Sequence, residues 1–276
     1  MSCPDCFKGS ILEGTPAGSI EERFHGAYFA PAATTSTTGS KRAIVLLTDI
    51  FGLPLKNCKV IADEFARRLG CDVWVPDLFA GKPFLTPEAL QQFPEKAGQK
   101  MGVLGGLKFA VTALGVLPSF IRNRPAVVDA RVVSASAIRC VEAIQAEKKY
   151  EKIGAIGYCF GGGVAVRLGG SSTIFDSIII AHPSPPSNAD ILSIKAPVAW
   201  VLAEEDFSLS PKRVAEIEAL YVDRPDAEHQ FITYKGTTHG FAARPNFKYP
   251  EVKEAFEKAF EDSVAWFEKT IPAQSI

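Results

Sequence analysis

The residues with the clearest chemical potential lie in a short motif around a cysteine, Gly157–Gly161 (GYCFG). The motif joins a segment of strand type, Lys152–Gly157, to a glycine-rich segment of helix type. Such a turn is too tight for large side chains two residues before or after its centre, so glycine is needed at both places. The positive end of the following helix favours a thiolate. We therefore predict that Cys159 is a nucleophile, the alternative being an inert thiol in a glycine-rich turn.

A nucleophile of this kind needs a base. The best candidate is His239, in a loop (GTTHG) that follows the strand-type segment His229–Tyr234. The competing histidines are weaker candidates. His25 is expected to precede the sheet, His229 opens a strand at the opposite edge, and His182 ends a strand at the correct edge but comes too early in the chain. We therefore predict that His239 is the base.

The base in turn needs a carboxylate that orients it. Three acids, Glu204, Glu205 and Asp206, follow the strand-type segment Pro197–Ala203. Around a turn of this type the order along the chain is nucleophile, acid, base. The carboxyl ends of parallel strands also meet at one edge of the sheet. We favour Asp206 because it lies furthest into the loop, and either glutamate is the alternative.

The elements that must position these residues alternate between strand and helix. Ala43–Thr48 (AIVLLT) is apolar without alternation, which is typical of a strand buried on both faces. Asn57–Leu69 has apolar residues on one helical face and is followed by Gly70, a helix-ending residue. The same reasoning predicts strands at Asp72–Pro76, Lys152–Gly157, Asp176–Ala181, Pro197–Ala203 and His229–Tyr234, and helices at Asp129–Ala146, from Gly161, at Pro211–Val222 and at Pro250–Lys269. This alternation predicts an α/β fold with a mostly parallel central sheet and helices on both faces.

Composition excludes several classes of protein. The 276 residues are 47% hydrophobic and 22% charged, with a net charge of −1, which excludes disordered, collagen-like and coiled-coil chains. The balanced charge gives no indication of a nucleic-acid or membrane-surface partner. Six cysteines are too few for a disulfide framework, and no signal-peptide or membrane-spanning pattern is found. We expect a cytoplasmic protein, and the sequence makes no prediction of oligomeric state.

No shift in composition divides the chain, so residues 1–276 are predicted to form one domain. About residues 1–40 form an N-terminal extension before the sheet. The irregular segment 86–124 is either a lid over a pocket or a helical insertion.

The remaining cysteines carry weaker signals. Cys3 and Cys6 form a lone CxxC pair without the second pair that a metal site needs, so we assign them a structural or incidental role and predict no metal. Cys58, Cys71 and Cys140 lie in or beside predicted core elements and are expected to be inert buried thiols.

From about Lys41 to Phe267 the sequence resembles the dienelactone hydrolase (carboxymethylenebutenolidase) family of the α/β-hydrolase superfamily. The motifs that carry the resemblance are Thr48–Gly52 (TDIFG), Val75–Phe79 (VPDLF), Gly157–Gly162 (GYCFGG), the Asp206 loop and His239–Phe241 (HGF). The opening segment Cys3–Gly9 (CPDCFKG) resembles fungal members.

The resemblance implies an α/β-hydrolase fold and a hydrolase that opens lactones or small carboxylic esters, with a small-molecule substrate and no metal or cofactor. Cys159 would be the nucleophile, His239 the base and Asp206 its orienting acid. Backbone N–H groups of Phe160 and Ile50 would form the oxyanion hole.

The resemblance also implies roles around the substrate. Other members have a glutamate at the place of Asp49, close to the resting cysteine, and substrate binding displaces it. Members that open dienelactone hold its carboxylate with arginines. Arg244 is the candidate here, the alternative being a solvated surface arginine, and no second arginine is identified within residues 86–124. His182 either contacts the substrate or makes a structural hydrogen bond.

Two other functions use the same residues. A thioesterase or acyl transferase would need the same nucleophile, acid and base. A non-catalytic ligand-binding or redox-sensing homologue would keep the pocket, with Cys159 as the oxidised residue. The complete set of three residues argues against the non-catalytic alternative.

Overall fold

The computed structural model describes residues 11–33, 40–85, 95–98, 111, 130–171, 173–224 and 227–273. The strands are β1 (Ser19–Glu21), β2 (Ala27–Ala30), β3 (Arg42–Leu47), β4 (Asp72–Val75), β5 (Lys152–Tyr158), β6 (Ser177–Ala181), β7 (Val198–Glu205) and β8 (His229–Thr238). The helices are the short 3-10 helix η2 (Glu22–Phe24) and the α-helices α1 (Asn57–Leu69), α4 (Ala130–Lys148), α5 (Phe160–Ser171), α6 (Asn188–Ser193), α7 (Pro211–Val222) and α8 (Pro250–Thr270).

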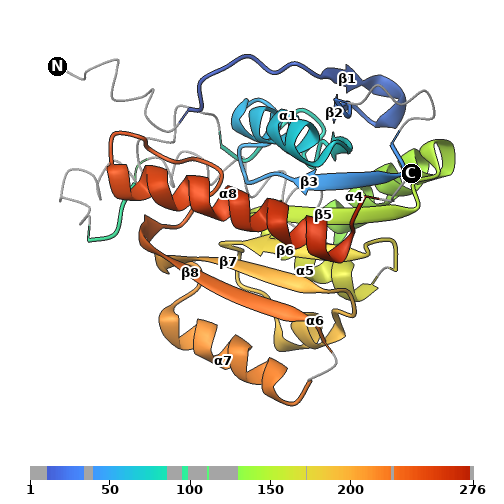
Figure 1. Ribbon diagram of the computed structural model, residues 1–276. Coiled ribbons are helices and arrows are strands. Elements are labelled where there is room, and N and C mark those ends of the chain that lie inside the picture. The colour runs from blue at the N-terminus through green and yellow to red at the C-terminus, as the bar shows by residue number, and fades with distance from the viewer. Residues whose placement is uncertain are drawn as a thin grey trace.

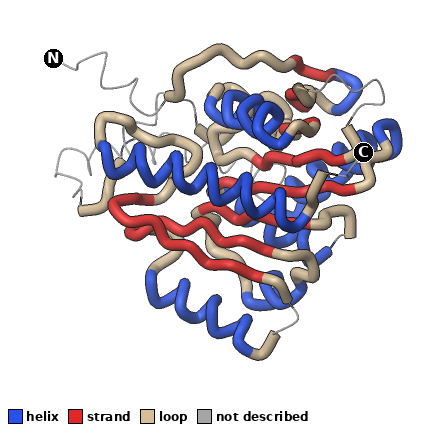
Figure 2. Tube along the Cα trace, viewed as in Figure 1, coloured by secondary structure: helices blue, strands red, loops and turns tan. Residues whose placement is uncertain are grey.

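The described strands form one sheet in the order β1-β2-β4-β3-β5-β6-β7-β8. From β4 to β8 every neighbouring pair is parallel, while β2 runs antiparallel to β4 and β1 antiparallel to β2. Figure 2 shows the strands as one twisted band between layers of helices. This is the α/β architecture that the alternation of strand and helix predicts, and the fold is that of the α/β-hydrolases.

Helices cover both faces of the sheet, and each face has its own hydrophobic core. On one face, α1 and α8 pack on side chains such as Ile156 and Val201 (Figure 1). On the other face, α4, α5, α6 and α7 pack on side chains such as Ala155 and Trp200. Because β3, β5 and β6 are buried on both faces, they read as continuous apolar runs rather than as alternating ones.

The register of the strands brings their carboxyl ends to one edge. Leu47 of β3 pairs with Gly157 of β5, and Tyr158 pairs with Ala181 of β6. Between β7 and β8 the register shifts: Ala203 pairs with Tyr234, but Glu205 pairs with Thr238. Four residues of β8 therefore span the same length as two residues of β7. This irregularity places the end of β8, Thr238, beside the end of β7, Glu205.

Most predicted elements are confirmed to within one or two residues, but three features differ. Residues 19–30, which we expected to lie in an extension before the sheet, form β1 and β2 of that sheet. The expectation that His25 precedes the sheet is therefore wrong, because β1 comes before it. α6 was not predicted, and β8 continues to Thr238, beyond the predicted end at Tyr234.

Several predictions lie outside the described residues. They concern Cys3, Cys6 and almost all of the segment 86–124. Within the described residues, no helix is long and apolar enough to cross a membrane.

Candidate active site

Cys159 lies at the sharp turn between β5 and α5, as the GYCFG motif predicts. Its φ angle is +54°, in the left-handed region that non-glycine residues rarely adopt. The backbone holds this conformation: Cys159 N–H donates to Ala181 O (3.0 Å), and Cys159 O accepts from the N–H groups of Ser184 (2.9 Å) and Gly163 (3.2 Å). The structure therefore places a strained, backbone-anchored cysteine at the carboxyl edge of the sheet.

The flanking glycines are required by close backbone approaches. A Cβ atom on Gly157 would lie 2.2 Å from Gly161 O, and one on Gly161 would lie 2.2 Å from Leu47 O. Both nearest atoms are backbone oxygens, which cannot move aside as the end of a flexible side chain could. Any larger residue would therefore displace the turn. This is the physical reason for glycine two residues on either side of Cys159.

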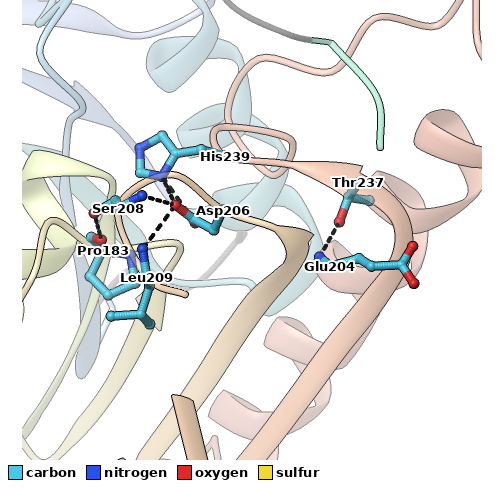
Figure 3. Close-up of polar contacts among 7 residues, drawn as sticks. All are labelled: Pro183, Glu204, Asp206, Ser208, Leu209, Thr237 and His239. Atoms are coloured by element: carbon cyan, nitrogen blue, oxygen red, sulfur yellow. Dashed lines mark hydrogen bonds and ion pairs between the residues drawn. The ribbon is translucent and has the colours of Figure 1, made fainter. Parts of the chain in front are cut away.

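Asp206 and His239 meet at the ends of β7 and β8. The Nδ1 atom of His239 lies 2.8 and 3.0 Å from the two carboxylate oxygens of Asp206, and both side chains are almost fully buried. Figure 3 shows the imidazole above the carboxylate. Asp206 is fixed in turn, because its Oδ1 accepts from the backbone N–H groups of Ser208 (2.7 Å) and Leu209 (3.2 Å).

The two alternative acids point elsewhere. Glu204 accepts from Gly236 N–H (2.8 Å) and pairs with Lys235 (2.9 Å), and Figure 3 shows its carboxylate directed away from His239. Glu205 accepts from Gly98 N–H (2.8 Å). Of the three candidates, Asp206 is the acid that contacts His239.

The charge environment connects His239 to Cys159. The pKa of His239 is raised to about 9. Burial of the ring opposes the charged form, but the negative charge of a Cys159 thiolate and the hydrogen bond to Asp206 outweigh it. The Nε2 atom, on the other side of the ring, is buried and has no hydrogen-bond partner within the described residues. We therefore attribute the effect of Cys159 to its charge rather than to a well-formed Sγ–Nε2 hydrogen bond.

This electrostatic coupling is directly measurable. In the wild-type protein His239 should be protonated at pH 7 and lose its proton near pH 9. In Cys159→Ala the thiolate is gone while burial still disfavours the charged ring, so the pKa should fall clearly below 9. Long-range ¹H–¹⁵N NMR spectra of the imidazole nitrogens, recorded from pH 5 to 10, give both values. An unchanged titration in Cys159→Ala would show that the thiolate does not act on His239.

Asp49 and Arg244 form a buried ion pair beside these residues. Arg244 Nε donates to Asp49 Oδ2 at 2.8 Å, and the two side chains are 5% and 0% exposed. Asp49 Oδ1 accepts from Phe51 N–H (3.0 Å). Burial raises the pKa of Asp49, while the positive charge of Arg244 opposes this shift. The alternative of a solvated surface arginine is wrong.

His182 is completely buried at the end of β6, with a φ of +32°. Its ring lies 5.2 Å, centroid to centroid, from that of His239 and 5.8 Å from that of Phe241. Neither ring nitrogen has a hydrogen-bond partner within the described residues, so the alternative of a structural hydrogen bond is not supported. Burial and the positive charges of His239 and Arg244 lower the pKa of His182 well below its usual value, so it is neutral at pH 7.

The two predicted oxyanion donors come just after β3 and β5, which are neighbouring strands of the sheet. Phe160 is the first residue of α5, where a helix N–H has no acceptor within the helix. Ile50 follows β3, and its carbonyl accepts from Leu85 N–H (3.4 Å). The ring of Phe160 packs near those of Phe79 (5.6 Å) and Phe84 (5.8 Å). The turn is thus bordered by an aromatic cluster that the sequence did not reveal.

The other described thiols lie in the protein interior. Cys58, Cys71 and Cys140 are buried and free, as predicted. Burial raises the pKa of Cys71 to about 12, that of Cys140 to about 11, and that of Cys58 well above its usual value. Within the described residues, no cluster of three or more His, Cys, Asp or Glu side chains could hold a metal ion.

One exposed residue beside the site was missed at the sequence level. Phe207, directly after Asp206, is 73% exposed, and its ring centroid lies 4.5 Å from that of His239. The only signal in the sequence is a large aromatic residue in a loop that carries an acid.

Comparisons with known proteins identify the family of this chain. The sequence model of the dienelactone hydrolase family matches residues 29–271. The chain is 28% identical over 271 residues to "Hydrolase tropI" of Talaromyces stipitatus, covering 97% of this chain and 95% of that protein. It is 24% identical over 268 residues to the human "Carboxymethylenebutenolidase homolog", covering 97% and 96%.

Solved structures share the fold. A dienelactone hydrolase-like promiscuous phosphotriesterase from metagenomic libraries has a TM-score of 0.61 at 17% identity, covering 88% of this chain and 92% of that one. A dienelactone hydrolase from Anabaena variabilis has a TM-score of 0.53 at 13% identity, covering 95% and 99%. From its sequence match and its fold, the chain belongs to the dienelactone hydrolase family and is a hydrolase that acts on carboxylic esters.

Proposed function

We propose that the protein is a cysteine-dependent hydrolase that opens lactones, including dienelactone-like ones, or small carboxylic esters through Cys159, His239 and Asp206. The observation that carries the proposal is the placement of His239. Its Nδ1 is held by a buried carboxylate, and its pKa is raised by the charge of the cysteine at the β5–α5 turn. A thiolate–imidazolium pair of this kind supplies both a nucleophile and a proton donor.

The proposed reaction has two stages. The Cys159 thiolate attacks the ester carbonyl carbon, and the negative charge that develops on the carbonyl oxygen is stabilised by the N–H groups of Phe160 and Ile50. When the C–O bond breaks, the departing alkoxide takes the proton from His239 Nε2, leaving an acyl-Cys159 thioester. Neutral His239 then removes a proton from water, whose oxygen attacks the thioester and releases the carboxylic acid. Asp206 holds the imidazole in the required orientation throughout.

Selective labelling tests the nucleophile. At pH 7.5 iodoacetamide should modify Cys159 much faster than Cys58, Cys71 or Cys140, because burial keeps those three thiols protonated. The experiment is best done in a Cys3→Ser/Cys6→Ser background, and peptide mass spectrometry gives the site of modification. p-Nitrophenyl acetate should protect Cys159 by acylating it. Labelling spread evenly over the four cysteines would contradict the proposed nucleophile.

We further propose that Arg244 recognises an anionic group of the substrate, with Asp49 as the carboxylate that the substrate replaces. The support is the Asp49–Arg244 ion pair itself, because a guanidinium that already holds one carboxylate has the geometry to hold another. In this proposal Asp49 occupies the anion position of the resting site. His182, buried and neutral beside His239, is proposed as a second polar contact.

Arg244→Ala should lower kcat/KM for an anionic ester roughly 10- to 150-fold relative to a neutral ester. This factor corresponds to a loss of about 1.5–3 kcal/mol of transition-state stabilisation. p-Nitrophenyl hemisuccinate and p-nitrophenyl butyrate are a suitable pair. Arg244→Ala leaves the Asp49 charge buried without this partner, which lowers the amount of folded enzyme and so lowers both apparent values of kcat/KM. The ratio of the two values is decisive because that loss cancels in it. Asp49→Asn/Arg244→Ala removes that charge and serves as the control. An unchanged ratio would exclude anion recognition by Arg244.

A thioesterase or acyl transferase is the second candidate, because the same three residues serve both reactions. Parallel assays with p-nitrophenyl acetate, acetyl thioesters and unsaturated lactones discriminate between them. A preference for thioesters, or transfer of the acyl group to an added alcohol faster than to water, would favour this candidate.

A further inference from the structure

Phe207 is exposed to solvent although it lies directly beside the buried Asp206–His239 pair. The residue is 73% exposed, whereas His239, whose ring lies 4.5 Å from that of Phe207 between centroids at an interplanar angle of 46°, is 5% exposed. Leaving a phenylalanine side chain in water forgoes the free energy that its burial would provide. What distinguishes Phe207 from the other exposed apolar residues is its contact with the buried His239 ring, because aromatic side chains beside a polar site are typical of ligand-binding pockets.

The backbone around Phe207 is fixed on both sides. The preceding residue, Asp206, is bonded to His239 and to the N–H groups of Ser208 and Leu209. Ser208 Oγ donates to Pro183 O (2.7 Å), and the Leu209 side chain is buried. Figure 3 shows these contacts at the base of the loop. The ring is thus presented from an ordered turn, so little conformational freedom is lost when a ligand packs against it.

The chemistry of the proposed reaction determines which part of a substrate lies next to this ring. Nδ1 of His239 is held by Asp206, so proton transfer to the leaving group must come from Nε2. The leaving oxygen therefore has to lie within hydrogen-bond distance of the imidazole. The first atoms beyond that oxygen belong to the alcohol portion of the ester, and the exposed ring against the same imidazole is Phe207.

We propose that Phe207 is a specificity-determining residue whose ring binds the alcohol portion of the substrate, and that this favours esters of aromatic alcohols. The inference rests on the proposed function, because it uses the position of the leaving group relative to His239. Two aromatic rings in offset or edge-to-face contact attract each other beyond simple area burial. An alcohol without a ring lacks that attraction and buries less apolar area.

Benzyl acetate and ethyl acetate test this proposal, because their alcohols have similar acidity and their acyl groups are identical. Phe207→Ala should lower the ratio of kcat/KM for benzyl acetate to that for ethyl acetate by about tenfold. Phe207→Tyr, which keeps the ring, should retain at least half of the wild-type ratio. Val222→Ala, which truncates another highly exposed apolar residue, at the end of α7, should leave the ratio unchanged.

The outcomes separate this inference from the function on which it rests. If Phe207→Ala slows both esters equally, the ring acts only by packing against His239, and the inference is wrong while the hydrolase stands. If neither ester slows, the ring makes no contact with the alcohol, and the inference is again wrong on its own. If the wild-type enzyme opens unsaturated lactones but hydrolyses neither ester, the inference is wrong while the proposed function stands. If it shows no Cys159-dependent hydrolysis of lactones or of either ester, the proposed function fails and the inference fails with it.

Discussion

Replacing Cys159 with alanine is expected to abolish ester hydrolysis, with a loss of at least about 10³-fold in kcat. The alanine side chain has no nucleophile, and water would have to attack the ester directly. Cys159→Ser should retain only a small residual rate, because a hydroxyl is far less anionic than a thiol beside an imidazolium and a helix N-terminus. Release of p-nitrophenol from p-nitrophenyl acetate measures the rate, and circular dichroism verifies the fold.

Cys140→Ala is the matched control for this variant. Cys140 is also buried, but it lies in α4 with its Sγ directed at Phe24 O (3.3 Å). Its removal should leave kcat within about twofold of the wild-type value, because the substitution leaves the β5–α5 turn intact. Full turnover by Cys159→Ala, or an equal loss in both variants, would mean that hydrolysis does not use the cysteine of the turn.

Sequence reasoning locates elements well where local signals are strong. α1 is confirmed with the predicted bounds, Asn57–Leu69, because its apolar residues recur on one helical face. It ends at Gly70, whose φ of +58° suits glycine. α7 is confirmed at Pro211–Val222, where Ser210 caps the helix by accepting from Arg213 N–H. In both cases the ends of the element are determined by residues within one turn of it.

Sequence reasoning fails where pairing over long distances determines the structure. β1 is three residues long, is partly exposed and exists because its backbone pairs with β2. It is therefore too short for its sequence to show the alternation of apolar and polar residues that predicts a strand. The Asp49–Arg244 ion pair joins residues 195 positions apart. The motifs place each residue near the sheet edge, but only the packed structure directs the arginine toward the aspartate and away from solvent.

The candidate site lies between these extremes. Chain order and the sheet-edge rule bring Cys159, Asp206 and His239 to one edge, and no rule distinguishes Asp206 from its two acidic neighbours beyond its place in the loop. In the structure, backbone hydrogen bonds distinguish Asp206 from the two glutamates. The N–H groups of Ser208 and Leu209 donate to Asp206 and hold its carboxylate toward His239. The two glutamates instead accept from Gly236 and Gly98.

Asp206→Asn is expected to lower kcat by about 10³- to 10⁴-fold while leaving the fold intact. The Asn carbonyl can still accept from Ser208 and Leu209. Its amide nitrogen, however, donates to His239 Nδ1 and selects the tautomer that carries the proton on Nε2. That tautomer cannot accept a proton from water in the second stage. Loss of the buried charge also removes one cause of the raised pKa of His239. The pKa of His239 should therefore be lower than in the wild-type protein, and the imidazolium should lose its proton at a lower pH.

Glu205→Gln and Glu204→Gln are the matched controls, because each removes one negative charge from the end of β7, next to Asp206, without changing a contact of His239. Both should retain kcat within about twofold of the wild-type value. The thermal midpoint of Asp206→Asn should remain close to that of these two variants, which separates a loss of chemistry from a loss of fold. A fully active Asp206→Asn together with an inactive Glu205→Gln would show that the acid is Glu205. In that case the loop would have to rearrange during turnover, because Glu205 accepts from Gly98 in the resting structure.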